Sequence, residues 1–206
     1  MSAPPKTVLN TTPAEAEAIR AAVRRADLAL LGDNFVVAGD AHVDGLVALL
    51  EDPAVSDPIY DLPRPLTRAN LSAWVDEAAR LREKGEALLV VCLDAGGTPW
   101  LYSRFTVWPD LSAAEIAGAH RADHQNDGLG KAGAARSFNF MFESLGVRLI
   151  CVTAALDNVR SARVIEAAGF VAMGERDGVR PDGSVRLSRY WEMTREAWRR
   201  REHGPV

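Results

Sequence analysis

A glycine-rich stretch, HQNDGLGKAGAARSF at residues 124–138, constrains the fold of this chain more than any other feature. It contains a G-x-G-x-x-G pattern at Gly128, Gly130 and Gly133. Glycines let a ligand approach the backbone closely, and the N–H groups of a turn that leads into a helix attract phosphate oxygens. The pattern therefore predicts a phosphate-binding turn, belonging either to a dinucleotide-binding fold or to another fold.

The surrounding sequence argues against a dinucleotide-binding fold. That fold needs a buried apolar strand before the glycines and several parallel strands after them. The residues before Gly128 read GAHRADHQND, and the chain beyond Gly133 is too short for the remaining strands. Asp157 falls near the place of a ribose-binding acid, so a nucleotide-binding oxidoreductase remains as the last-ranked alternative.

Hydrophobic periodicity and turn residues predict a mixed α/β chain. The capping pattern at Thr12, Pro13 and Glu15 predicts a helix to about Arg25, which we expect at the periphery because it is poor in large apolar residues. Further helices are expected at 43–50, 67–85, 129–145 and 161–168, and the proline-rich segment EDPAVSDPIYDLPRPL is expected to be a loop. Strands are expected in NFVVAGD, on both sides of DAGG in EALLVVCLDAGGTPWLYSRFTVW, in AAEIAGAHRADH and VRLICVTAA, and in GFVAMGE and SVRLSRYWEMT around the tip RDGVRPDG.

Composition excludes several classes of protein. Lys and Arg total 24 against 28 Asp and Glu, a net charge of -4 that does not suit a general nucleic-acid binder. The hydrophobic share of 48% and the charged share of 25% are typical of a globular domain. The N-terminal residues lack the apolar segment of a signal peptide, and no stretch is apolar for long enough to span a membrane, so we expect a cytoplasmic protein.

The cysteines and histidines suggest neither a covalent intermediate nor a metal site. Cys92 and Cys151 lie inside apolar runs, where buried thiols are more common than nucleophiles. No G-x-S-x-G motif or paired Cys-His arrangement is evident. Metal-ligand spacing is absent from the four histidines, His42, His120, His124 and His203.

Two motifs follow one another in a characteristic order. The first, QNDGLG at 125–130, matches a Q/R-x-x-G-x-G/A acetyl-CoA loop, and the second, ALDNVRSARVIEAAGF, carries Asn158, Ser161 and a closing Gly169-Phe170 pair. Together they resemble the GNAT superfamily of N-acetyltransferases. AEIAGAHRADHQ is similar to the family's fourth strand and LSRYWEMTREAW to its last, so the likeness covers roughly residues 34–198. The most similar branch includes the ribosomal-protein N-terminal alanine acetyltransferases, which have a serine at the position of Ser161.

The resemblance implies a fold and a reaction. The expected GNAT fold is an α/β (α+β) architecture with a central, mixed, mostly antiparallel twisted sheet that splays between strands 4 and 5, flanked by helices and preceded by an extra N-terminal helix. The extent of the resemblance implies an N-terminal extension with a helix at 1–33, an acetyltransferase domain at 34–198 and a C-terminal tail at 199–206. The implied reaction is direct acetyl transfer from the cosubstrate acetyl-CoA to a primary amine of a small molecule, a peptide or a protein N-terminus, without a metal. A transferase of type EC 2.3.1 is therefore expected, and a homodimer is compatible with it.

The resemblance also assigns the cosubstrate contacts. Main-chain amides of the loop would hold the pyrophosphate, and the pantetheine arm would pair with the exposed edge of the fourth strand. A main-chain N–H near His120 would stabilise the oxyanion. The implied binding residues are Ala119, His120, Arg121, Gln125, Asn126, Asp127, Gly128, Leu129, Gly130, Lys131, Asn158 and Ser161.

Three residues are candidates for proton transfer. Glu115 matches a glutamate common on this strand and would act as the base directly or through a water, with a structural role in the strand pair or at a dimer face as the alternative. His120 is the second candidate base, or only a backbone contact. Many family members have a tyrosine where this chain has Ile165, so Ser161 would protonate the thiolate, unless it merely caps the helix after Asn158. Asn158 would bond the pantetheine or form a turn.

The acceptor is expected to enter between the helices of residues 41–83, the proline-rich loop and the tip RDGVRPDG. Aromatic side chains that would form its walls, or the core instead, are Tyr60, Trp100, Tyr102 and Trp108. The branch commonly has Arg-Asp where this chain has Arg186 and Leu187, so recognition of ribosomal proteins does not carry over. A longer acyl-CoA substrate and a catalytically silent CoA-binding sensor remain as alternatives.

Overall fold

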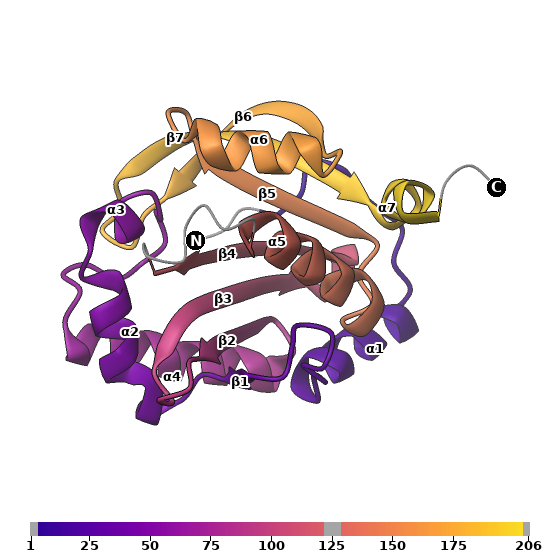
Figure 1. The fold of residues 1–206 in the computed structure, drawn as a ribbon. Coiled ribbons are helices and arrows are strands. Elements are labelled where there is room, and N and C mark those ends of the chain that lie inside the picture. Colours follow the sequence, from indigo (N-terminus) through magenta and orange to yellow (C-terminus); the bar gives the residue numbers. More distant parts are fainter. Residues whose placement is uncertain (1–3, 122–128, 204–206) are drawn as a thin grey trace.

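The computed structural model describes residues 4–121 and 129–203, without the side chains of 129–131, 202 and 203. Its centre is a seven-stranded sheet of order β1-β2-β3-β4-β5-β7-β6 (Figure 1). The pair β4 and β5 is parallel, and the other neighbouring pairs are antiparallel. The strands are β1 (Phe35–Val37), β2 (Ala87–Leu93), β3 (Pro99–Trp108), β4 (Ala113–His120), β5 (Leu149–Ala155), β6 (Val171–Val179) and β7 (Val185–Thr194). The predicted mixed, mostly antiparallel sheet is confirmed.

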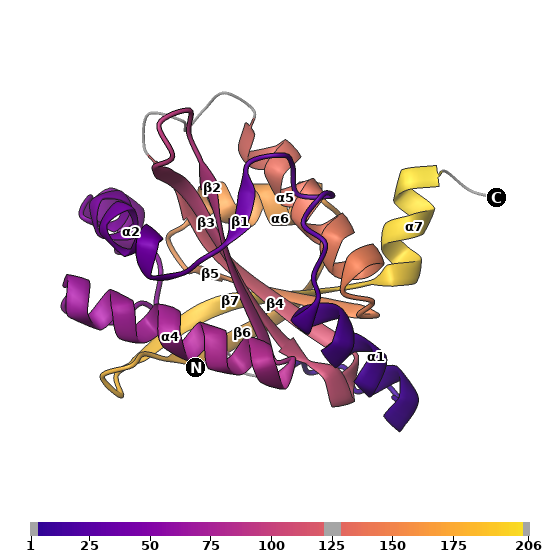
Figure 2. The same ribbon diagram turned by 90° about the horizontal axis from the view of Figure 1, so that it is seen from below.

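Helices cover both faces of the sheet (Figure 2). One face, called the α4 face below, packs against α2 (Val43–Leu50), α3 (Pro53–Ser56) and α4 (Arg68–Lys84). The opposite α5 face packs against α5 (Leu129–Asn139), its π-helical continuation η4 (Phe140–Ser144), α6 (Val159–Ala167) and α7 (Arg195–His203). Short 3-10 turns lie at Asp40–His42 (η1) and Pro109–Leu111 (η2). Within the described ranges, no helix has the length and apolar character that a membrane span requires.

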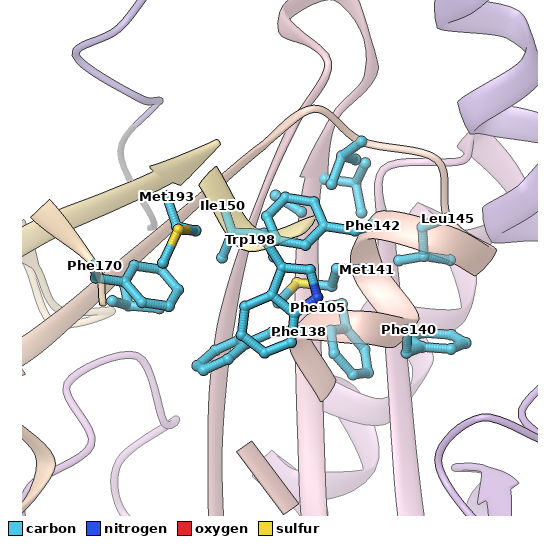
Figure 3. Close-up of a cluster of buried hydrophobic side chains, with 14 of the residues drawn as sticks. Phe105, Phe138, Phe140, Met141, Phe142, Leu145, Ile150, Phe170, Met193 and Trp198 are labelled. Carbon is cyan, nitrogen blue, oxygen red and sulfur yellow. The ribbon is translucent and has the colours of Figure 1, made fainter. Parts of the chain in front are cut away.

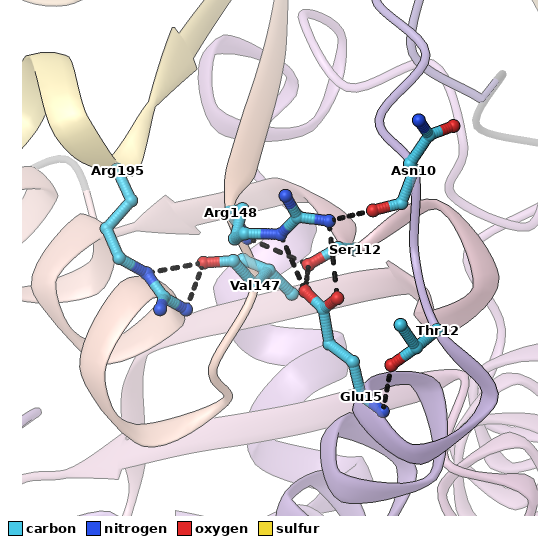
Figure 4. Close-up of polar contacts among 7 residues, drawn as sticks. All are labelled: Asn10, Thr12, Glu15, Ser112, Val147, Arg148 and Arg195. Atoms are coloured by element: carbon cyan, nitrogen blue, oxygen red, sulfur yellow. Dashed lines mark hydrogen bonds and ion pairs between the residues drawn. The ribbon is translucent and has the colours of Figure 1, made fainter.

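The N-terminal helix α1 (Pro13–Arg24) forms as its capping pattern predicts, since Thr12 Oγ1 accepts a hydrogen bond from the Glu15 N–H at 3.2 Å. It is not peripheral, because Ile19 and Val23 are buried in the core of the α5 face. The Glu15 carboxylate also accepts hydrogen bonds from Arg148 Nε at 2.6 Å and Ser112 Oγ at 2.8 Å (Figure 4). Apolar burial and this polar network therefore fix α1 to the sheet.

Helix α4 begins and ends where the sequence indicates. Thr67 Oγ1 accepts from the Asn70 N–H at 3.2 Å, and the helix stops at Gly85, whose φ of 77° is left-handed. A Cβ at Gly85 would lie 2.5 Å from the Cα of Arg20 on α1. Glycine at this position thus allows both the turn and the close approach of the two helices.

Helix α7 is not predicted by the sequence analysis. The Thr194 hydroxyl accepts from the Ala197 N–H at 3.2 Å, and Trp198 enters the aromatic cluster of the α5 face (Figure 3). The Trp198 ring packs edge-on against Phe138 with centroids 5.9 Å apart. Because Trp198 is the only large apolar residue of this otherwise polar helix, the helix lacks the apolar periodicity that would reveal it in the sequence.

Two connections also differ from the expected ones. The proline-rich loop includes the single turn of α3, which Asp52 caps by accepting from the Ala54 N–H at 2.9 Å. Strand β6 extends through the expected tip as far as Val179, and the chain reverses between Arg180 and Ser184 instead, where Gly183 has a φ of 84°. The hairpin is therefore longer than expected and reaches the proline-rich loop, since a Cβ at Gly178 would lie 3.1 Å from the Tyr60 ring.

Candidate active site

Strands β4 and β5 separate after three paired positions. The parallel register joins Ala113 to Leu149, Ala114 to Ile150 and Glu115 to Cys151, and no described residue of β5 pairs with the rest of β4. Figure 1 shows the two strands diverging from this shared end. The splay that the family resemblance implies between strands 4 and 5 is confirmed.

A cleft of about 1490 Å³ fills the space that the splay opens. Its walls come from β4 between Ile116 and His120, the end of β5, the start of α6 and one side of α5. On the α4 face it reaches the loop around Tyr60 and the β6–β7 hairpin around Arg186. The cleft therefore runs between the separated strands and connects the two faces of the sheet.

The open edge of β4 presents alternate backbone groups to this cleft. The Arg121 N–H donates to the Trp100 carbonyl at 2.9 Å, so it faces β3. Since backbone groups alternate along a strand, those of Gly118 and His120 face the opposite side, toward the gap. Gly118 also permits close packing, because a Cβ there would lie 2.6 Å from the Tyr102 carbonyl oxygen.

The phosphate groups are expected to bind at the start of α5, and α5 lines the cleft from Gly133 to Phe138. The helix begins at Leu129, as predicted, so Leu129, Gly130 and Lys131 occupy its first turn. The first N–H groups of a helix have no partner within it, and the helix dipole adds positive potential there. The preceding candidates, Gln125, Asn126, Asp127 and Gly128, lie outside the described residues, as does His124.

Asn158 is the residue that caps α6. Its Oδ1 accepts a hydrogen bond from the Ser161 N–H at 3.0 Å. The capping role that the sequence analysis considered for Ser161 therefore belongs to Asn158. Both residues line the cleft, together with Ile165, which lies one helical turn beyond Ser161.

Glu115 is buried beside the cleft rather than on its surface. Only 4% of the residue is exposed, and it is not one of the residues that line the cleft. Its Oε1 accepts a hydrogen bond from Thr153 Oγ1 at 3.2 Å, and Thr153 does line the cleft. Thr153 is not among the residues predicted from the sequence, since a threonine in an apolar strand carries no signal of a polar role.

Both cysteine thiols are buried, and one described histidine lines the cleft. Burial raises the pKa of Cys151, and the nearby Glu115 carboxylate raises it further, while burial also raises the pKa of Cys92. Both thiols are therefore protonated near neutral pH, as expected of buried cysteines.

His120 lines the cleft, whereas His42 accepts a hydrogen bond from the Gly39 N–H at 3.0 Å through Nδ1. The described residues contain no cluster of potential metal ligands.

The end of the cleft where the acceptor is expected lies on the α4 face. Of the expected wall aromatics, Tyr60, Trp100 and Tyr102 line the cleft and Trp108 does not. Asp61 lies beside them, 7% exposed, and its carboxylate pairs with Arg104 Nη1 at 3.3 Å. This buried ion pair was not predicted, because its two members come from segments that only the fold brings together.

Comparisons with known proteins agree with this architecture. An aminoglycoside acetyltransferase, AAC(6')-Ib, in complex with ribostamycin and coenzyme A has a TM-score of 0.67 at 20% identity, over 84% of this chain and 98% of that one. RimJ of Mycobacterium smegmatis in complex with CoA-disulfide has a TM-score of 0.68 at 15% identity, over 84% of each chain. The ribosomal-protein-S5-alanine acetyltransferase of Vibrio fischeri has a TM-score of 0.66 at 14% identity, over 81% of this chain and 96% of that one.

These likenesses establish the fold, and no curated protein sequence matches the chain. The family follows from the sequence itself. The family model described as "Acetyltransferase (GNAT) domain" matches residues 36–171, which include β4, the glycine-rich stretch and α6. The chain belongs to the GNAT acetyltransferase family.

Proposed function

We propose that this chain transfers an acetyl group from acetyl-CoA to a primary amine in a single direct step. The observation that carries the proposal is the cleft between β4 and β5, which extends from α5 at Gly133–Phe138 to the α4 face of the sheet around Tyr60 and Arg186. A long thiol cosubstrate and an amine can therefore approach each other from opposite faces of the sheet. Acetyl-CoA supplies the activated acetyl group.

One set of groups in the chain binds acetyl-CoA, and a second set transfers protons. The amides of residues 125–131 hold the pyrophosphate, and the edge of β4 at Ala119, His120 and Arg121 aligns the pantetheine arm. The fit is supported by the backbone groups of Gly118 and His120 that face the gap. A main-chain N–H near His120 then lies where negative charge develops on the carbonyl oxygen.

Glu115 is the proposed base. Because it does not line the cleft, it takes the acceptor's proton through the Thr153 hydroxyl or a water rather than directly. His120 is the alternative base, since it lines the cleft. Ser161 donates a proton to the leaving thiolate and recovers one from solvent. This role is supported by its place in the cleft and by its freedom from helix capping.

Thermal stability with acetyl-CoA and CoA, followed by release of free thiol with a panel of primary amines, tests this proposal. A ligand that binds only the folded chain raises its melting temperature. Gly128→Asp should abolish that rise by placing a carboxylate against the pyrophosphate. Gly39→Asp is the matched control, because Gly39 lies outside the cleft, in extended backbone with open space at its Cβ.

Stabilisation by acetyl-CoA without thiol release from any amine would indicate a CoA-binding sensor, and preferential turnover of longer acyl-CoA would change the donor. Stabilisation by NAD in place of CoA would refute the proposal.

A further inference from the structure

Arg186 holds its guanidinium group at the acceptor end of the cleft. It lines the cleft from β7, and its Cζ lies 4.8 Å from the centre of the Tyr60 ring. Nε donates to Ser188 Oγ at 3.1 Å, and Nη1 donates to the Pro58 carbonyl. These contacts fix the plane and position of the guanidinium without neutralising its charge.

No carboxylate of the described residues lies within ion-pair distance of Arg186. Asp61 is engaged with Arg104 at 3.3 Å, and Asp61 and Asp157 attract Arg186 only over a longer range. Burial lowers the pKa of Arg186, because the partly buried group has lost part of its hydration. Partly buried cations normally have an anionic partner, and among the described residues this one does not.

One nitrogen of the group remains available. Within the described part of the chain, Nη2 of Arg186 donates to no protein group, whereas Nε and Nη1 do. A carboxylate oxygen at Nη2 would gain a charge-assisted hydrogen bond, the strongest kind that a guanidinium makes. Because stacking on Tyr60 already fixes the side chain, little further conformational entropy would be lost.

We propose that Arg186 binds a carboxylate of the acceptor, so that the acceptor is an amine that also carries a carboxylate, such as an amino acid or a short peptide with a free C-terminus. This inference rests on the proposed acetyl transfer and narrows its acceptor. A polyamine without a carboxylate would leave the guanidinium without a partner and would add like charge beside it.

The test measures acetyl transfer to amino acids and dipeptides, each as the free acid and as the carboxamide. Wild type should use the acid with a kcat/KM about tenfold or more above that of the amide, because a hydrogen bond between charged groups is lost in the amide. Arg186→Gln should bring this ratio close to one, mainly through KM for the acid, and Arg186→Lys should restore part of it. The KM for acetyl-CoA should stay unchanged in both variants.

Arg189→Gln is the matched control, since Arg189 is an exposed arginine of the same strand outside the cleft, and it should keep the wild-type ratio. The wild-type ratio does not depend on how well any variant folds. Three results would overturn the inference without contradicting acetyl transfer. They are equal use of acid and amide by the wild type, a preference for the acid that persists in Arg186→Gln, and turnover confined to amines without a carboxylate. Failure to bind acetyl-CoA at all would overturn both.

Discussion

The side-chain oxygen of Asn158 accepts a hydrogen bond from the backbone N–H of Ser161 at 3.0 Å, at the point where the cleft meets α6. This bond makes Asn158 the N-cap of the helix, so the Ser161 hydroxyl is not needed for capping. One residue thus fixes the backbone, and its neighbour one turn on supplies the hydroxyl proposed for catalysis.

Asn158→Ala should lower the free energy of unfolding by about 1 kcal/mol, because α6 loses its cap. Asn158→Asp, which keeps a capping oxygen, should retain most of the stability. Urea denaturation of the three proteins measures both effects. An alanine variant as stable as wild type would show that the cap contributes nothing.

Glu115→Gln should lower kcat at least about a hundredfold, the lower range for loss of a general base, while the affinity for acetyl-CoA is unchanged. Glu192→Gln is the control, since Glu192 is equally buried at 4% exposure but its hydrogen bonds come from Lys6, Thr7 and Tyr190, none of which lines the cleft. Its kcat should be close to that of wild type. Steady-state kinetics with a saturating amine measures kcat for both variants and for the wild type. Full turnover by Glu115→Gln would transfer the role of base to His120.

Glu192 should make stability depend on pH. Burial alone would raise its pKa, but hydrogen bonds from Thr7, Tyr190 and the Lys6 N–H outweigh burial, and the pKa lies below the ordinary value of 4.5. A carboxyl with a lower pKa in the folded state stabilises it fully above the ordinary value and loses that contribution as pH falls through the folded pKa.

Glu192→Gln should therefore cost about 1–2 kcal/mol at pH 7, and the gap to wild type should narrow below pH 4.5. Denaturant midpoints across this range measure the gap. A gap that does not change with pH would mean that the carboxylate's charge plays no part.

Tyr102→Phe should leave the free protein as stable as wild type or more stable by up to about 1 kcal/mol. The Tyr102 hydroxyl is buried and has no hydrogen-bond partner among the described residues, while its ring packs against Trp74 at 5.6 Å. Tyr190→Phe is the contrasting variant, because the Tyr190 hydroxyl donates to Glu192 at 2.6 Å and its loss should destabilise. A clear loss of stability in Tyr102→Phe would reveal a partner for that hydroxyl, such as a buried water.

The sequence predicts most elements because local signals specify them. Thr12 and Thr67 cap their helices, Gly85 ends one, and the DAGG turn joins β2 to β3. Each of these effects depends on a few consecutive residues. The splay of β4 from β5 could be predicted only through the family resemblance.

The missed features depend on contacts between distant segments. Helix α7 packs through Trp198, its only large apolar side chain, and the β6–β7 hairpin extends to meet Tyr60. The bond from Thr153 to Glu115 and the pair of Asp61 with Arg104 each join separate segments. No periodicity or spacing in the sequence encodes such partners. The family resemblance could therefore indicate Glu115, but the sequence could not indicate its hydrogen bond from Thr153, which lines the cleft.

A crystal structure of the chain with CoA tests the central claim most directly. We expect the diphosphate to lie against the amides of residues 125–131 at the start of α5, with the pantetheine arm in the gap between β4 and β5 beside Gly118 and His120. A diphosphate held elsewhere on the chain, or a gap that stays closed to the pantetheine arm, would contradict it.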